Sequence, residues 1–168
     1  MSVRAVIFDR DGVLIEDSGY PHKSEHLRWM PGAVAAIAAL NRADVLVLVA
    51  TNQSGIARGF YDEATMHRFH ELMQFDLARS DAEIDAFYFC PFHEDAAIAA
   101  YRQADHPDRK PNPGMLLRAL AEWRITPEEA LLIGDRETDM EAARRAGVRG
   151  VLYSGGDLAA LTLAEISR

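Results

Sequence analysis

Cysteine is almost absent from this sequence, which has one cysteine in 168 residues. A single cysteine excludes an intramolecular disulfide framework and fits a reducing compartment. No uncharged hydrophobic run is long enough to cross a bilayer, and no apolar signal region precedes the first strand-like segment. We therefore expect a cytoplasmic protein that has no membrane partner.

Positive charge is also scarce, since 18 Lys and Arg residues stand against 26 Asp and Glu residues and leave a net charge of −8. A nucleic-acid partner would need a basic stripe, so this balance argues against one. It does not exclude a small phosphorylated metabolite, because local amide donors and a few cations are enough to bind an anion. We expect a monomer with such a substrate.

Repeats, low-complexity tracts and signs of a second domain are missing as well, so we expect one domain over residues 1–168. Helical patterns at 33–40, 62–80 and 138–146 lie between short apolar runs. These runs predict five buried strands, at 3–8, 45–49, 86–90, 130–133 and 150–153. Buried strands that alternate with helices predict an α/β fold of the Rossmann-like type, with a mostly parallel sheet and helices on both faces.

Local signals predict where several helices begin and end. Short polar residues favour the first position, and glycine favours the position after the last turn. A Ser or Thr followed three residues later by Glu can form a capping box. The predicted signals are Asp62 and Asn112 as N-caps, Gly147 as a C-cap, and Thr162 with Glu165 as a capping box.

Polar clusters stand where the predicted strands end. In an open parallel sheet the carboxyl ends of the strands form the ligand crevice, so segments that are remote in sequence converge there. Four such clusters are present: Asp9 with Asp11, residues 51–54, Arg109 with Lys110, and Asp135 with Asp139.

These side chains suit phosphate chemistry. Carboxylates such as Asp9 and Asp135 are the oxygen ligands that Mg²⁺ prefers, and the cation would offset the repulsion between a carboxylate nucleophile and a phosphate. Asp11 could protonate the leaving oxygen and then activate water. Thr51 and Lys110 could hold the phosphate oxygens.

Plainer readings exist for each residue taken alone. An aspartate after a strand is usually a turn residue or a helix cap, and a lysine before a proline is usually solvated. The joint occurrence of four clusters, each at a strand end, favours the chemical reading. A phospho-acceptor or regulatory module without turnover is the alternative from another class, and Asp11 argues against it because such modules lack an acid/base two residues after the acceptor.

The motifs resemble those of the haloacid dehalogenase-like (HAD) phosphatases. Residues 8–13 (FDRDGV) are similar to their first motif, Thr51 to the second, Lys110 to the third and residues 134–139 (GDRETD) to the fourth. The resemblance implies that Asp9 is the nucleophile and Asp11 the acid/base, and that Thr51 and Lys110 bind the phosphoryl group. It implies Mg²⁺ held by Asp9, Asp135 and the Asp11 carbonyl, with Asp139 in support.

A narrower resemblance covers essentially the whole chain. Residues 17–20 (DSGY), 51–59 (TNQSGIARG) and 109–115 (RKPNPGM) resemble the heptose 1,7-bisphosphate phosphatases, with histidinol-phosphatases as relatives. This implies removal of the 7-phosphate in heptose supply for lipopolysaccharide or a related glycan, and histidinol phosphate or another small metabolite is the alternative substrate. It also implies that Arg109 contacts the second phosphate or the sugar. The implied pocket residues are Asp17, Ser18, Gly19, Tyr20, Asn52, Gln53 and Ser54.

The zinc loop of that family is altered here. The family places Cys-x-His and then Cys-x-Cys before the Arg-Lys-Pro, whereas this chain has Cys90, Phe92 and His93, and later only His106. A structural zinc site needs four ligands, and at most three remain. We therefore expect no zinc and a buried Cys90.

A cap domain is not expected either. The segments from Asp11 to Thr51 and from Thr51 to Lys110 are too short to hold one. We expect an open site, screened only by the loops at 15–31 and 91–108.

Overall fold

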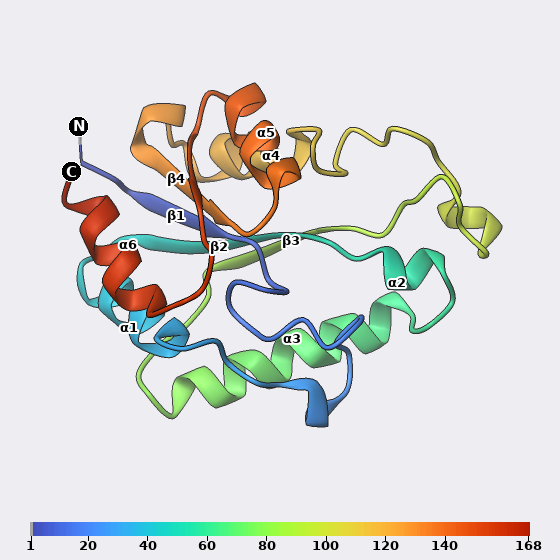
Figure 1. The fold of residues 1–168 in the computed structure, drawn as a ribbon, viewed down its shortest axis with the longest axis horizontal. Coiled ribbons are helices and arrows are strands. Elements are labelled where there is room, and N and C mark those ends of the chain that lie inside the picture. The colour runs from blue at the N-terminus through green and yellow to red at the C-terminus, as the bar shows by residue number, and fades with distance from the viewer. Residues whose placement is uncertain (1) are drawn as a thin grey trace.

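The computed structural model describes residues 2–168 and has five parallel strands in one sheet, in the order β3-β2-β1-β4-β5. Figure 1 shows the helices layered on both faces of this sheet. The predicted fold class is therefore confirmed. The strands are β1 (Ala5–Phe8), β2 (Leu46–Asn52), β3 (Ala86–Cys90), β4 (Ala130–Gly134) and β5 (Arg149–Leu152).

Alternate side chains of each strand enter two different cores, as the period of two in a strand requires. Val6 and Phe8 of β1 pack in the core that includes buried residues of α1, α3 and α6, and Ala5 and Ile7 pack in the core that includes α4 and α5. Both faces of β1 are thus buried, which explains why its sequence is continuously apolar. The helices are α1 (Ala33–Arg42), α2 (Ser54–Ala57), α3 (Glu63–Ala78), α4 (Gly114–Trp123), α5 (Glu137–Ala146) and α6 (Leu158–Ile166).

Two of the predicted helix signals are confirmed. The Asp62 carboxylate accepts a hydrogen bond from the Thr65 amide at 2.8 Å and caps α3. Gly147 ends α5 in the left-handed conformation, with φ of 73°. The apolar stripe of α3 is buried as its spacing predicts, through Met66, Phe69, Met73 and Leu77.

The other two signals were wrong. Helix α4 begins at Gly114, and the amide of Asn112 instead donates to the carboxylate of Asp105 at 2.7 Å. Helix α6 begins after Asp157, whose carboxylate accepts from two amides of the first turn, so Thr162 and Glu165 lie inside the helix. Asp157 accepts hydrogen bonds from the free amides at the start of the helix, so Thr162 and Glu165 have no free amides to cap.

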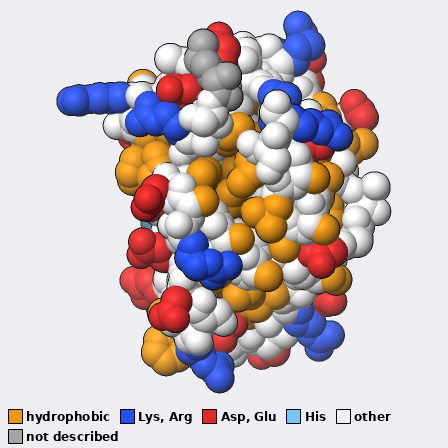
Figure 2. Space-filling view, turned by 90° about the vertical axis from the view of Figure 1, so that its left-hand side faces the viewer, with side chains coloured by type: hydrophobic (Ala, Val, Ile, Leu, Met, Phe, Trp, Pro, Cys, Tyr) orange, Lys and Arg blue, Asp and Glu red, His pale blue; other side chains and the backbone are white. Residues whose placement is uncertain are grey.

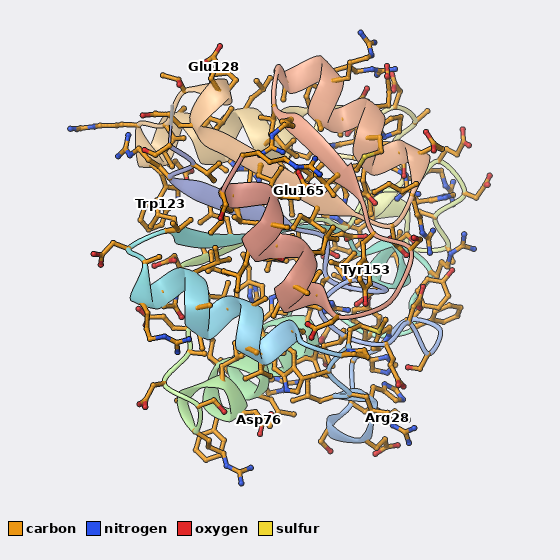
Figure 3. The ribbon with its side chains drawn as sticks, turned by 60° about the vertical axis from the view of Figure 1, so that its left-hand side comes forward. Arg28, Asp76, Trp123, Glu128, Tyr153 and Glu165 are labelled. Atoms are coloured by element: carbon orange, nitrogen blue, oxygen red, sulfur yellow. The ribbon has the colours of Figure 1, made fainter. Side chains whose placement is uncertain are left out.

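Side-chain contacts outside the sheet tie the loops and the edge strand to the helices. Trp29, in the loop after β1, donates from its indole to Asp76 of α3 at 2.7 Å. On β5, an edge strand of the sheet, Arg149 donates to Glu165 of α6 at 2.6 Å. Figure 3 labels Asp76 and Glu165, which lie on these two helices. Between β3 and α4 the described chain is a loop with one short 3-10 turn at Ala99–Tyr101, so the expected absence of a cap at that point agrees with the fold.

The side of the molecule that carries α1, α6 and both chain ends is shown in Figure 2. Hydrophobic side chains gather there in a band between charged ones. Of the helices within residues 2–168, none combines the length and the apolar character needed to span a membrane.

Replacing Gly147 tests the C-cap of α5. A Cβ in the left-handed conformation is strained, so we expect Gly147→Ala to lower the free energy of unfolding by about 1 kcal/mol and the Tm by about 2–4 °C. Gly147→Asn is the matched variant and should lose less, because asparagine tolerates this conformation. Thermal unfolding measures both, and an alanine variant as stable as the parent would contradict the assignment.

Candidate active site

A cavity of about 480 Å³ opens at the carboxyl edge of the sheet. It gathers residues that are far apart in the sequence, as expected from the strand ends. Ser18 does not line it and is exposed, because the Gly19 amide donates to Asp17 at 3.1 Å and forms a turn around it. The predicted residues that do line it are Asp9, Asp11, Asp17, Gly19, Tyr20, Thr51, Asn52, Gln53, Ser54, Arg109, Lys110 and Asp139.

Asp9 follows β1 directly and continues its ladder, since its amide donates to the Ile133 carbonyl at 3.0 Å. One carboxylate oxygen accepts from the Arg10 amide at 2.9 Å and lies 3.0 Å from Nζ of Lys110. The residue is only 8% exposed. The Asp9 carboxylate is thus fixed in the cavity lining by the Arg10 amide and the Lys110 ammonium.

Lys110 is buried, and three acceptors surround its ammonium group. Nζ lies 2.7 Å from Asp139, 3.0 Å from Asp9 and 2.7 Å from the Ala50 carbonyl. Its backbone is held as well, because the Asn52 amide group donates to the Lys110 carbonyl and accepts from the Lys110 amide, both at 3.0 Å. Asn52, which we expected in the substrate pocket, therefore also positions the lysine.

Burial sets the protonation of this group of side chains. It raises the pKa of Asp9 from 3.8 to about 7, with Asp139 and Asp11 adding to the rise and Lys110 opposing it. Burial alone would lower the pKa of Lys110, but Asp9 and Asp139 outweigh it and the pKa stays above its ordinary value. Lys110 therefore remains charged. Its single positive charge does not offset the cost of burying the Asp9 carboxylate, because the pKa of Asp9 stays raised.

Three carboxylates come together beside the lysine. Asp9, Asp135 and Asp139 each place an oxygen within 4.8 Å of the others. Asp139 already accepts from Lys110 and from the amides of Asp135 and Arg136, whereas one buried oxygen of Asp135 has no hydrogen-bond partner. An unpartnered buried carboxylate oxygen, in a group with one ammonium for three carboxylates, suits a divalent cation.

Gly12 makes room for this group. Its φ is +87°, and a Cβ there would collide with the carboxylate of Asp135. The chain therefore needs a glycine at this point both for its backbone conformation and for the close approach of the turn after β1 to Asp135, which follows β4. Asp135 does not line the cavity itself, and lies under the turn that carries Asp11 and Gly12.

Asp11 points its carboxylate at Arg10 rather than at the acidic group. The two oxygens accept from Nε at 2.7 Å and from Nη2 at 3.1 Å. Arg10 also donates from Nη2 to the side-chain carbonyl of Gln53 at 3.1 Å. The side-chain amide of Gln53 in turn donates to Thr51 at 2.8 Å, and the Tyr61 hydroxyl donates to Gln53 at 2.5 Å. This network joins the turn after β1 to the segment after β2.

Two neighbouring arginines, of which only Arg109 lines the cavity, have no carboxylate partner among the described ion pairs. Arg109 lines it and makes one long contact, 3.5 Å to the Phe92 carbonyl. Nε of Arg58 is buried without a partner. Burial lowers the pKa of Arg109, and the nearby charge of Arg58 lowers it further. By contrast, Asp17 is neutralised by Arg136 at 3.2 Å.

The loop that carries a zinc site in similar sequences is held by ring stacking here. His106 stacks on Phe92 with centroids 4.2 Å apart, and its Nδ1 lies 3.8 Å from the buried Cys90 sulfur. Burial raises the pKa of the Cys90 thiol. Across residues 2–168 His93 joins no group of three metal-ligating side chains, and the absence of zinc stays a prediction.

Sequence reasoning missed several residues of the site. Tyr61 lines the cavity, and Arg10 lies behind it with no exposure at all. Residues 136–138 also belong to the site, and the available signal was their position between Asp135 and Asp139 in the fourth motif. The cavity is also lined by Arg136, Glu137 and Thr138.

Comparison with known proteins agrees with this geometry. A HAD-hydrolase-like family model matches residues 108–167. The chain is 42% identical over 155 residues to the D-glycero-beta-D-manno-heptose-1,7-bisphosphate 7-phosphatase of Rhodopseudomonas palustris, covering 92% of this chain and 85% of that protein. It is 38% identical over 147 residues to the protein of the same name from Escherichia coli, covering 88% and 76%.

A solved structure matches the fold over nearly the full length. The crystal structure of the D,D-heptose 1,7-bisphosphate phosphatase from B. bronchiseptica, complexed with magnesium and phosphate, superposes with a TM-score of 0.81 at 35% identity, covering 97% of this chain and 87% of that one. The chain therefore belongs to the HAD-like hydrolases, in the family of the heptose 1,7-bisphosphate 7-phosphatases.

Proposed function

We propose that this protein is a Mg²⁺-dependent phosphatase that forms an aspartyl-phosphate on Asp9 and removes the 7-phosphate of D-glycero-D-manno-heptose 1,7-bisphosphate. The observation that carries the chemistry is the group of Asp9, Lys110 and Asp139, which are buried and line the cavity, with the half-buried Asp135 beside them. The substrate is supported by the similarity to proteins of that name and by Arg109, which lines the cavity and has no carboxylate partner among the described ion pairs.

The acidic group fits Mg²⁺. Asp9 and Asp135 would hold the ion with side-chain oxygens, together with the backbone carbonyl of Asp11. Bound there, the ion would reduce the repulsion between the Asp9 carboxylate and the anionic phosphate. Asp139 would act through Lys110, since one of its oxygens contacts the ammonium at 2.7 Å.

The protein side chains divide the reaction into two steps. A carboxylate oxygen of Asp9 attacks phosphorus while the bond to the sugar oxygen breaks, and Asp11 gives its proton to that oxygen. Asp11 then takes a proton from water, which attacks phosphorus and releases inorganic phosphate from Asp9. Lys110 and Thr51 hold the phosphoryl oxygens as charge shifts onto them.

The second phosphate of the substrate would bind the two unpaired arginines. Arg109 lines the cavity and Arg58 lies behind the lining residue Tyr20, 5.9 Å from its ring centroid; neither has a carboxylate partner among the described ion pairs, and arginine is suited to phosphate. A histidinol substrate would instead need free acidic groups for its amine and imidazole. Asp17 is paired with Arg136, so among the described residues Glu137 is the one lining carboxylate that has neither an ion pair nor a part in the chemistry.

We further infer that the enzyme acts as a monomer in the cytoplasm. The acidic group, Lys110 and the cavity lining form a complete phosphatase site within one copy of the chain. The single buried cysteine suits a reducing compartment.

Replacing the nucleophile tests the chemistry. We expect Asp9→Asn to abolish turnover, because the amide cannot form the aspartyl-phosphate. The metal-free variant should also be at least as stable as the parent at pH 8, because burial makes the negative charge of Asp9 unfavourable. Phosphate release and thermal unfolding measure the two effects. Asp95→Asn, at an exposed position, is the control, and retained turnover in Asp9→Asn would sink the assignment.

Metal removal should give a pH-dependent change in stability. Without metal, folded Asp9 keeps a proton up to about pH 7, whereas the unfolded chain loses it near 3.8, so stability should fall as the pH rises through that window. Mg²⁺ replaces the proton, so the Tm gain on adding excess Mg²⁺ to chelator-treated protein should be larger at pH 8 than at pH 5. Asp135→Asn should lose most of the gain. Equal gains at both pH values would contradict the assigned site.

A substrate panel tests the second phosphate. We expect Arg109→Gln to lower kcat/KM for the heptose bisphosphate by about tenfold to hundredfold, the value of a lost charged hydrogen bond. Hydrolysis of p-nitrophenyl phosphate should hardly change, because it has no second phosphate. Arg118→Gln, on the exposed face of α4, is the control. An equal loss on both substrates, or preference for histidinol phosphate by the parent enzyme, would contradict the substrate assignment.

A further inference from the structure

Arg10 is the largest fully buried side chain of the described chain, and it lies between the two aspartates of the first motif. A buried guanidinium is costly unless its donors are paired. Here Nε and Nη2 form the two contacts with Asp11, and Nη2 also donates to the Pro21 carbonyl at 2.9 Å and to Gln53 at 3.1 Å. The cost of burying this group is thus offset mainly at one catalytic carboxylate.

Helix α3 holds the other end of the guanidinium. Nη1 of Arg10 lies 3.1 Å from Nε2 of His70, and because arginine has only donors, this histidine nitrogen must accept. Burial, with the charge of Arg10 second, lowers the pKa of His70 to about 2, so the ring stays neutral and can accept. His70 itself stacks on Phe87 at 4.1 Å, and Phe69 lies 5.1 Å under the guanidinium. The guanidinium is therefore fixed from behind.

Asp11 has few other restraints. Its side chain is 19% exposed, and within residues 2–168 the one hydrogen bond that it accepts from a residue other than Arg10 comes from Gln53, at 3.4 Å. Two parallel bonds from a planar fork fix the rotation of a carboxylate, which one bond from a lysine would not do. Arg10 thus decides where the oxygens of Asp11 point.

We propose that Arg10 is a positioning residue that orients the carboxylate of Asp11 for proton transfer to the leaving oxygen, and that His70 holds Arg10 in place for this task. The inference rests on the acid/base role of Asp11 in the proposed function. It also ties the loop after β1 to the chemistry, because the Pro21 carbonyl accepts from the same guanidinium.

The leaving group distinguishes this role from simple packing. A sugar alkoxide is strongly basic and needs a proton as it departs, whereas a dinitrophenolate leaves without one. A misplaced acid therefore slows the first kind of substrate and spares the second. A general loss of folded structure would slow both alike.

The test compares kcat/KM over a series of monophosphates from 2,4-dinitrophenyl to phenyl and glycerol phosphate, because kcat/KM reports the departure of the leaving group. We expect Arg10→Lys to lose about tenfold to hundredfold on phenyl and glycerol phosphate, and almost nothing on dinitrophenyl phosphate. The control is Leu77→Val, a core change in α3 two turns after His70. It should leave the dependence on the leaving group unaltered. An equal loss across the series in Arg10→Lys would overturn the proposal.

Asp11→Asn separates this inference from the proposed function. If Arg10 acts through Asp11, then Arg10→Lys should add little in the Asp11→Asn background, so the two effects are not additive. If Asp11→Asn leaves the dependence on the leaving group unchanged, the acid role fails and this inference fails with it. If Asp11→Asn alters that dependence and Arg10→Lys does not, only this inference is overturned.

A second variant covers the case in which Arg10→Lys does not fold. His70→Phe removes the acceptor and keeps an aromatic ring against Phe87. It should shift the dependence on the leaving group in the same direction as Arg10→Lys, by a smaller factor. An unaltered dependence in a folded His70→Phe protein would then overturn the proposal.

Discussion

The ammonium group of Lys110 lies between Asp9 and Asp139, at 3.0 and 2.7 Å, and joins the end of β1 to the first turn of α5, the helix that follows β4. Its third bond, to the Ala50 carbonyl, adds β2, and Asn52 clamps its backbone from the same strand. Because these strands are buried on both faces, their ends are placed by the core, and Lys110 comes to them on the loop between β3 and α4. The sheet thus acts as the frame for one buried cation.

That frame is not neutral by itself. The group has three carboxylates and one ammonium, which contacts two of them, and burial keeps the pKa of Asp9 and of Asp135 raised. A site of this kind costs stability until a divalent cation binds, and the same shortage of positive charge makes the site select one. Arg10 is a second buried charge near this site. Asp11 compensates its charge, and His70 holds its guanidinium in place. Stability and chemistry are therefore coupled through the same few charges.

Much of this could be predicted from the sequence, for particular reasons. Asp9, Thr51 and Asp135 follow apolar strands, and parallel strands bring their carboxyl ends together, so the fold, the cavity and the acidic group followed from strand positions. Arg10 could not be found in this way, because its partners at residues 21, 53 and 70 come from three remote segments. Capping failed at Thr162 for a different reason, since a local pattern does not reveal that Asp157 starts the helix earlier.

Trapping the phosphorylated enzyme tests the central claim most directly. Acyl phosphates are reduced by borohydride, which would convert a phosphorylated aspartate to homoserine during turnover, and peptide mapping by mass spectrometry locates the change. The account predicts homoserine at Asp9, only when both substrate and Mg²⁺ are present. Homoserine at Asp11, Asp135 or Asp139, or steady turnover without reduction at any aspartate, would contradict it.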